Sequence, residues 1–227
     1  MAENPGPVEA HYTRPDLGEI IVAALKAAGK DLDHLTPDDL APVDEFHGGQ
    51  RPATVRLGEL VGFSGNERVL DVGSGLGGPS RYIAWRYGCR VSGIDLTAEF
   101  VRVAEMLTRR TGLTARVDYR QGDALDLPFD DQSFEVVWSR EPLTSFLLPQ
   151  PVIREKLEMA GFRVLVWQDT TEEARQAAHT RARSVEGPPP VLGTHLIIGD
   201  DWRAMFRNSA RNLEERRTEL FNAVLTR

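Results

Sequence analysis

Three aspartates that end short apolar segments are the residues of this sequence best suited to ligand chemistry. They are Asp71, Asp95 and Asp123. Each segment has the composition of a β-strand, and the carboxyl ends of parallel strands meet at one edge of a sheet. Ligands bind at that edge in open α/β sheets. We therefore expect the three carboxylates to border one site.

A loop of small residues follows Asp71 and leads into a helix that starts near Pro79, a residue favoured at a first helical position. Glycines at Gly73 and Gly75, with Ser74 between them, let the backbone approach a ligand because no Cβ intrudes. The first turn of the helix supplies unpaired amide donors. The loop therefore predicts a site for a nucleotide-type cofactor.

Two cofactor classes fit the glycines. Gly73, Gly75 and Gly78 satisfy the Gly-x-Gly-x-x-Gly spacing of dinucleotide sites, so a nicotinamide-dependent oxidoreductase is one alternative. The carboxylate of Asp71 would repel a pyrophosphate, whereas it would hold the ammonium of S-adenosylmethionine by a charge-assisted hydrogen bond. Asp95 lies where Rossmann-like sites hold ribose hydroxyls, about 20 residues past the glycines. These positions favour S-adenosylmethionine.

The glycine loop and two of the acids also have structural alternatives. The loop after Asp71 could be an ordinary strand-turn-helix corner in which the glycines allow tight packing. Asp95 is suited to cap the helix that begins near Thr97, and Asp123 is suited to a turn because Gly-Asp pairs favour turns. As a ligand, Asp123 would accept the adenine amino group while Ala124 offers its backbone amide.

Composition excludes several partners. The 227 residues are 41% hydrophobic and 27% charged, as in globular proteins, and the net charge of −7 disfavours nucleic acid. The longest aliphatic run, 20–25, is too short to span a bilayer. A lone cysteine, Cys89, and an acidic, proline-rich start unlike a signal peptide favour the cytoplasm. We expect no nucleic-acid partner and no membrane partner.

Hydrophobic periodicity divides the chain. Residues 1–10 read as a flexible tail, 11–62 as a cap of three helices, and 63–227 as an α/β core with a late helical lid at about 169–215. From Arg68 strands alternate with helices, which predicts a mostly parallel sheet with helices on both faces. The segment 220–225 is expected as a last, antiparallel strand.

At this point the chain resembles the class I S-adenosylmethionine-dependent methyltransferases. The matching motifs are Val69–Ser80, Gly93–Leu96, Gly122–Ala124 with Leu127–Phe129, and Ser133–Ser139. Upstream, Glu45–Gly49 with Ala53 and Thr54 is similar to the subgroup that includes glycine/sarcosine, phosphoethanolamine and tocopherol methyltransferases.

The resemblance implies a Rossmann-like fold and methyl transfer from S-adenosylmethionine to a nitrogen, oxygen or carbon nucleophile of a small molecule. It places Gly73 and Gly75 at the methionine moiety, Ser139 beside the cofactor, and His47 with Gly48 over the methionine end. The full set of expected cofactor-binding residues is His47, Gly48, Asp71, Gly73, Ser74, Gly75, Asp95, Leu96, Gly122, Asp123, Ala124 and Ser139.

Methyl transfer from a sulfonium depends mainly on alignment and desolvation, and a general base is needed only if the acceptor must lose a proton. The candidate bases are His47 and Tyr12, both in the cap; a cofactor contact or a structural hydrogen bond is the alternative for His47, and packing for Tyr12. Four further residues could line the acceptor pocket or pack the core, and no role is assigned to them: Trp138, Phe146, His195 and Trp202. No cluster has the spacing of metal ligands.

One departure from the family pattern follows Ser139. The family pattern continues with a helix, a Lys-Pro-Gly-Gly-like turn and a fifth strand. Here Ser139 is followed directly by Arg140 and by sequence that resembles a later region of the family. About one strand and one or two helices are therefore missing. A true deletion and an incomplete sequence both explain this. The strand 162–168, reached through the helix 151–160, is expected to fill the gap by a right-handed crossover. A cofactor-binding protein without catalysis is therefore a second hypothesis. The methyl acceptor and the oligomeric state stay open.

Overall fold

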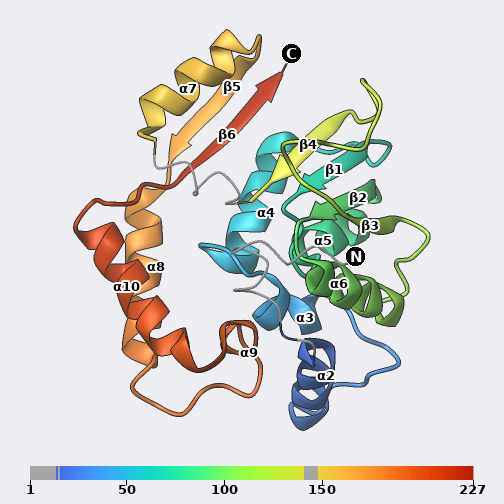
Figure 1. The fold of residues 1–227 in the computed structure, drawn as a ribbon, viewed down its shortest axis with the longest axis vertical. Coiled ribbons are helices and arrows are strands. Elements are labelled where there is room, and N and C mark those ends of the chain that lie inside the picture. The colour runs from blue at the N-terminus through green and yellow to red at the C-terminus, as the bar shows by residue number, and fades with distance from the viewer. Residues whose placement is uncertain (1–13, 15, 141–147, 227) are drawn as a thin grey trace, which may run out of the picture.

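The computed structural model describes residue 14, residues 16–140 and residues 148–226 (Figure 1). Within these ranges three helices come first. Strands and helices then alternate, except that two strands, Val117–Gln121 and Val136–Ser139, follow one another and that several helices are consecutive before the last strand. The elements, in order, are α2 (Leu17–Ala27), α3 (Pro37–Asp44), α4 (Gln50–Val61), β1 (Arg68–Val72), α5 (Gly78–Tyr87), β2 (Arg90–Asp95), α6 (Ala98–Arg110), β3 (Val117–Gln121), β4 (Val136–Ser139), α7 (Gln150–Met159), β5 (Arg163–Asp169), α8 (Thr171–Ser184), α9 (His195–Ile198), η2 (Gly199–Asp201), α10 (Trp202–Glu214) and β6 (Phe221–Thr226).

The central sheet has four parallel strands in the order β3-β2-β1-β4. Its strands alternate in side-chain direction, and Val69, Val91, Val117 and Trp138 share one buried cluster with apolar residues of α4, α5 and α6. The parallel register brings the carboxyl ends of all four strands to one edge. The expected α/β class, with a parallel sheet flanked by helices, is confirmed.

The first three helices pack onto the core through apolar stripes. Leu17, Ile21 and Leu25 of α2 are fully buried with Val103 and Leu107 of α6, at the i, i+4 spacing of one helix face. At the start of α3, the Thr36 hydroxyl accepts the Asp39 amide, and Asp39 accepts the Thr36 amide in return. This packing fixes the segment after α3 beside the carboxyl edge of the sheet.

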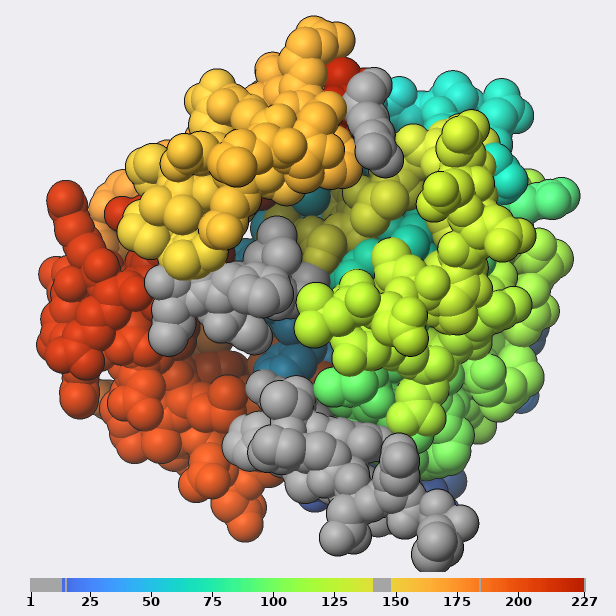
Figure 2. Space-filling view, turned by 45° about the horizontal axis from the view of Figure 1, so that its top comes forward, coloured from blue at the N-terminus to red at the C-terminus, as the bar shows by residue number. Residues whose placement is uncertain are grey.

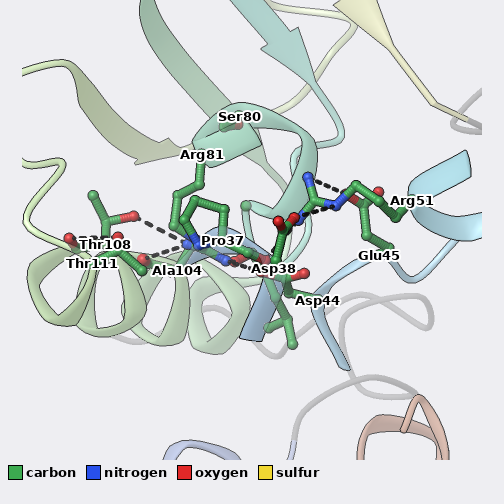
Figure 3. A network of polar contacts seen from close by, with 12 residues as sticks. Pro37, Asp38, Asp44, Glu45, Arg51, Ser80, Arg81, Ala104, Thr108 and Thr111 are labelled. Atoms are coloured by element: carbon green, nitrogen blue, oxygen red, sulfur yellow. Dashed lines mark hydrogen bonds and ion pairs between the residues drawn. The ribbon is translucent and has the colours of Figure 1, made fainter. Parts of the chain in front are cut away.

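A buried arginine joins these layers (Figure 3). The guanidinium of Arg81, in α5, is inaccessible to solvent and donates to Asp44 Oδ2 at 2.8 Å and to the carbonyl of Leu76 at 2.5 Å. Its other terminal nitrogen donates to the Ala104 carbonyl and to Thr108 Oγ1, both at 3.1 Å in α6. One side chain thus links the end of α3, the glycine loop and α6.

The strand 162–168 does not fill the gap in the central sheet, so that prediction is wrong. The corresponding strand, β5, pairs with β6 in a separate antiparallel ribbon. The helix before it, α7, buries no residue, so it does not anchor the ribbon onto the core. The antiparallel pairing of the last strand is confirmed, although its partner is β5 and the ribbon is separate.

Candidate cofactor site

The loop after β1 turns sharply because two glycines adopt the left-handed conformation. Gly73 has φ of 73° and Gly75 has φ of 54°. The amides of Gly73 and Ser74 both donate to the Ile94 carbonyl, at 2.9 and 3.1 Å, so the loop is bound to the end of β2. The hydroxyl of Ser74 is buried and makes no hydrogen bond to the residues that the structure describes. The loop therefore offers an unused polar atom at the sheet edge.

Asp95 fastens this loop from the other side. Its Oδ2 accepts the Gly75 amide at 2.8 Å, and its Oδ1 accepts the Thr97 amide at 2.9 Å at the start of α6. Burial raises the pKa of Asp95, against the lowering effect of these two bonds. The helix-capping alternative for Asp95 is thus realised, and each oxygen keeps a further lone pair for a ligand.

Asp71 is almost completely buried and has a single strong partner. The Ser80 hydroxyl donates to its Oδ2 at 2.5 Å. Burial raises the pKa of Asp71 to about 7, although the Ser80 hydrogen bond lowers it. A nearby positive charge favours the ionised form of a carboxyl. A cationic ligand would therefore lower the pKa of Asp71 and pair with its carboxylate.

The loop after β3 forms the next part of the wall. Asp123 Oδ1 accepts the Leu125 amide at 2.8 Å, an Asx-type turn, so the turn alternative for Asp123 is also realised. A Cβ at Gly122 would lie 2.7 Å from the side chain of Ile94, which explains the glycine. The peptide Gly122–Ala124 lies against β2 and faces the same cavity as the glycine loop.

His47 is held over the site by a buried polar network. Its Nε2 lies 2.7 Å from Glu45 Oε2 and 3.1 Å from Thr54 Oγ1. Its Nδ1 lies 3.1 Å from the Gly48 carbonyl and 3.4 Å from Arg140 Nη2. Burial raises the pKa of Glu45, but the His47 hydrogen bond and the Arg51 guanidinium, 3.0 Å away, bring it below its usual value. The imidazole is therefore oriented by a carboxylate (Figure 3 shows Glu45 and Arg51).

These groups border one cavity of about 850 Å³. Eleven of the twelve expected cofactor residues line it: His47, Gly48, Asp71, Gly73, Ser74, Gly75, Asp95, Leu96, Gly122, Asp123 and Ala124. Ser139 is not among its lining residues; its hydroxyl donates to the Val72 carbonyl at 3.0 Å, and the residue lines a neighbouring cavity. Tyr12 lies outside the described residues.

The opposite wall of the cavity comes from α8 and α10, which lie within the segment 169–215 that we expect as a late helical lid. The residues that line it were not predicted: Arg181, Met205, Phe206, Ser209 and Asn212. The sequence of α10 is strongly charged and suggests a solvated face, and only its apolar stripe signals burial. Figure 2 shows the molecule hollowed between these late helices, in red and orange, and the α/β core in green.

The residues considered for an acceptor pocket lie elsewhere. Trp138 is buried in the core against Phe63, with ring centroids 6.1 Å apart. His195 and Trp202 contact each other, with ring centroids 5.7 Å apart, and neither lines the cavity. Phe146 lies outside the described residues. Among the residues that the structure places, no group of three His, Cys, Asp or Glu could hold a metal ion.

The polar groups that line the cavity fit S-adenosylmethionine. The buried carboxyl of Asp71 suits an ammonium, the glycine loop leaves room for backbone approach, and the Ser74 hydroxyl is available as a partner. A pyrophosphate would meet the carboxyls of Asp71 and Asp95 at the mouth of the loop. The fold and the site together define a Rossmann-like protein whose cavity fits a cationic, nucleoside-type cofactor.

Comparison with known proteins agrees with this class. A family model described as "Methyltransferase domain" matches residues 70–159. The chain is 33% identical over 100 residues to glycine/sarcosine/dimethylglycine N-methyltransferase of Actinopolyspora halophila, covering 44% of this chain and 18% of that relative. It is 32% identical over 172 residues to an uncharacterized protein of Haemophilus influenzae, covering 73% of this chain and 67% of that protein.

Solved structures share the fold. Geranyl diphosphate C-methyltransferase of Streptomyces coelicolor, in complex with S-adenosylhomocysteine, aligns with a TM-score of 0.57 and 18% identity over 94% of this chain and 97% of that one. The chain belongs to the class I S-adenosylmethionine-dependent methyltransferases. It spans 18%, 20% and 42% of the lengths of the first three curated relatives that it matches. In the described part of the chain, no helix has the length and apolar character needed to cross a membrane.

Proposed function

We propose that this protein transfers a methyl group from S-adenosylmethionine to a nitrogen, oxygen or carbon atom of a small molecule. The observation that carries the proposal is the cavity in which three strand-end aspartates, the glycine loop and the late helices face one another. When bound, the cofactor supplies an electrophilic methyl group on a sulfonium. The chain's own residues then have to orient both molecules and keep water out.

The cofactor residues divide the ligand between them. Asp71 takes the methionine ammonium, and the backbone at Gly73 and Gly75 lies along the methionine. Asp95 takes the ribose hydroxyls. Its carboxylate oxygens already accept hydrogen bonds from two backbone amides, and their remaining lone pairs are available for the ribose. Asp123 and Ala124 take the adenine. Hydrogen bonds that already fix the carboxylate of Asp95 support this division, because a preorganised acceptor loses little freedom on binding.

The acceptor occupies the part of the cavity under α8 and α10. Phe206 and Met205 supply an apolar surface there, Ser209 and Asn212 supply neutral hydrogen-bonding groups, and Arg181 supplies a positive charge. A wall of this composition combines apolar surface with a few polar groups that fix orientation, as in small-molecule sites generally. Relatives named for glycine and sarcosine, for tocopherol and for ajmaline support a small-molecule acceptor of this kind.

His47 and Tyr12 stay our candidate bases for acceptors that must lose a proton. The pairing of His47 Nε2 with Glu45 supports the first, since a carboxylate orients the imidazole of many general bases; Nδ1, beside Gly48 and Arg140, is then the nitrogen that would accept the proton. The same contacts suit a positioning role for His47. A His47→Gln variant distinguishes the two, because loss of a base removes a limb of the pH–rate profile, whereas loss of positioning raises KM at every pH.

A cofactor-binding protein without catalysis is the second candidate function. The interruption of the sheet after β4 supports it, since the ribbon β5–β6 is not paired to the central strands. We place the protein in the cytoplasm. The single cysteine, Cys89, whose pKa burial raises to about 11, supports a reducing compartment.

Two measurements test the proposal. Calorimetric titration with S-adenosylhomocysteine and with NAD should give binding of the first only; tight NAD binding without S-adenosylhomocysteine binding would overturn the cofactor assignment. A methylation screen with labelled S-adenosylmethionine over amines, phosphoethanolamine and phenols should then identify an acceptor. Cofactor binding with turnover of no acceptor would favour the non-catalytic function.

A further inference from the structure

The serine at the third position of α5 lies behind the carboxyl of Asp71, outside the cofactor cavity. Ser80 is fully buried and is not among the residues that line the cavity, whereas Asp71 is one of them. The Ser80 hydroxyl donates to Asp71 Oδ2 at 2.5 Å, and this is the single hydrogen bond that the described residues make to the carboxyl. A ligand in the cavity therefore meets Asp71, and Ser80 acts on that ligand only through the carboxyl.

The direction of the Ser80 hydroxyl is set by its neighbours in α5. A serine in a helix commonly returns its hydroxyl to the carbonyl four residues earlier. Here that carbonyl, of Leu76, accepts a hydrogen bond from the Arg81 guanidinium at 2.5 Å. Figure 3 shows Arg81 extending from the same turn of α5 toward α6. Because the Leu76 carbonyl has this partner, the Ser80 hydroxyl is directed to Asp71.

The first turn of α5 is packed tightly against two other elements. A Cβ at Gly77 would overlap the Tyr119 hydroxyl of β3, and a Cβ at Gly78 would overlap the Asp44 carbonyl at the end of α3. The backbone of the turn is therefore in direct contact with its surroundings on both sides. This packing leaves Ser80 little freedom to move away from Asp71, so the donor is already in place before a ligand binds.

Burial is the largest influence on the pKa of Asp71 and raises it, and the Ser80 hydrogen bond is the largest influence that lowers it. Four ionisable side chains of neighbouring elements also face this carboxyl: Glu45 and His47 after α3, Asp95 at the end of β2, and Tyr119 of β3. The two acids raise the pKa of Asp71, and the histidine lowers it. Before a cation enters the cavity, the Ser80 hydroxyl thus contributes most to keeping the carboxyl ionised, because a charge-assisted hydrogen bond is about twice as strong as a neutral one.

We propose that Ser80 is a positioning residue of the cofactor site, which holds Asp71 Oδ2 from behind so that the ionised carboxyl presents Oδ1 to the ammonium of S-adenosylmethionine. The proposal rests on the assignment of Asp71 under the proposed function. The hydrogen bond gives the ligand a carboxylate that is already charged and oriented, so less binding energy is needed to deprotonate and orient it.

The first measurement follows the carboxyl without any ligand. Carbon-13 NMR of the aspartate carboxyls gives the pKa of Asp71, and the Asp71→Asn variant identifies its signal. The Ser80→Ala variant should raise this pKa by about one pH unit, because the donor to the charged form is lost. Ser80→Thr retains a hydroxyl and should restore the wild-type value. An unchanged pKa in Ser80→Ala would overturn the proposal, whether or not the protein binds the cofactor.

Calorimetry with S-adenosylhomocysteine then connects the carboxyl to the site. At pH 7, where half of the wild-type carboxyl is ionised, Ser80→Ala should bind about fivefold more weakly than the wild type. At pH 9 both carboxyls are ionised, so the two affinities should agree within about twofold. A purely structural role would weaken binding equally at both pH values.

Thr108→Val is the matched control. It removes a buried hydroxyl of α6 that contacts Arg81 and Tyr119 and does not contact Asp71, so the pH dependence of binding should stay that of the wild type. Equal weakening of Ser80→Ala at pH 7 and pH 9, a raised pKa with unchanged affinity, or the same pH-dependent loss in Thr108→Val would overturn the proposal. Wild-type protein that binds no S-adenosylhomocysteine at any pH would instead contradict the proposed function, a failure that the NMR result distinguishes from a failure of Ser80.

Discussion

The buried carboxyl of Asp71 is the residue on which the electrostatics of the cofactor site depend. Its pKa of about 7 results from burial, which the Ser80 hydrogen bond only partly offsets. An ammonium ligand needs the ionised form, and its binding in turn lowers the pKa. If Asp71 binds the cofactor as we propose, we expect cofactor affinity to depend on pH across the neutral range.

Affinity for S-adenosylhomocysteine should fall by about tenfold between pH 8 and pH 6, because the ionised fraction of a group with a pKa of 7 falls about tenfold over that interval. Affinity is thus highest above the pKa and is lost as the pH decreases through it. Calorimetry at several pH values measures the profile. The Asp71→Asn variant should bind more weakly and show a flat profile, and a wild-type profile that is already flat would contradict the assignment of Asp71.

Asp95 is the residue assigned to the ribose. The Asp95→Ala variant should weaken S-adenosylhomocysteine binding more than tenfold, or about 1.4 kcal/mol, because it removes both the ribose acceptor and the two amide bonds that hold the loop. Asp131→Ala removes an exposed carboxylate in the turn before β4 and serves as the control. Unchanged affinity in the Asp95 variant would show that the ribose lies elsewhere.

These acids and the glycines were predictable because a strand end and its following loop are local in sequence. The capping and turn roles of Asp95 and Asp123 were also foreseen, and both coexist with exposure to the cavity. The hydrogen-bond partners of His47 were not predicted, because its contact with Glu45 depends on how the chain folds after α3. Spacing alone does not show which groups around a residue become buried.

At the scale of elements, the ion pair of Arg81 and Asp44 connects α5 to α3. Both side chains are fully buried, with 2.8 Å between Nη2 and Oδ2. Burial raises the pKa of Asp44, so its carboxylate depends on this guanidinium to stay charged. Removing one partner leaves the other charge buried without compensation, which costs far more than a surface pair does.

The Arg81→Met variant should lower the free energy of unfolding by about 3–5 kcal/mol, measured by urea denaturation. The double variant with Asp44→Leu should lose less, because no charge is then stranded. Arg154→Met breaks the exposed pair with Glu158, which has an N–O distance of 3.0 Å, and should change stability by less than about 1 kcal/mol. A loss below 1 kcal/mol in the Arg81 variant would refute the role of the pair.

The helices and strands themselves were largely evident from periodicity, whereas Arg81 gave no signal. The three early helices, the strands that follow them and the last antiparallel strand all carry apolar patterns of the right period. An arginine in a helix is ordinarily a surface residue. Its burial here follows from a contact with α3, 37 positions earlier, and such contacts are not encoded in local pattern.

At the scale of the whole molecule, the described residues form a four-stranded core and a two-stranded ribbon. The pairing of β5 could not be predicted, because a strand's pattern indicates its faces and not its neighbour in the sheet. A ribbon of two strands is marginally stable unless other elements pack against it.

Native-state hydrogen exchange should therefore show the amides of β5 and β6 exchanging at least about tenfold faster than those of β1 and β2. The helix before the ribbon, α7, buries no residue, and β1 is buried at Val69, Leu70 and Asp71. Mass spectrometry of peptides spanning 163–169 and 68–72 measures the difference. Equal protection would mean that the ribbon unfolds together with the core.

The close approach of Gly78 to Asp44 restricts how this protein can be re-engineered. A methyl group at Gly78 would overlap the Asp44 carbonyl, so the first turn of α5 and the end of α3 touch through bare backbone. A chimera that takes its first 62 residues from a relative will have to keep this backbone contact between α3 and α5. Replacing residues 1–62 to change the substrate range will therefore succeed only when the end of α3 and the first turn of α5 are taken from the same relative.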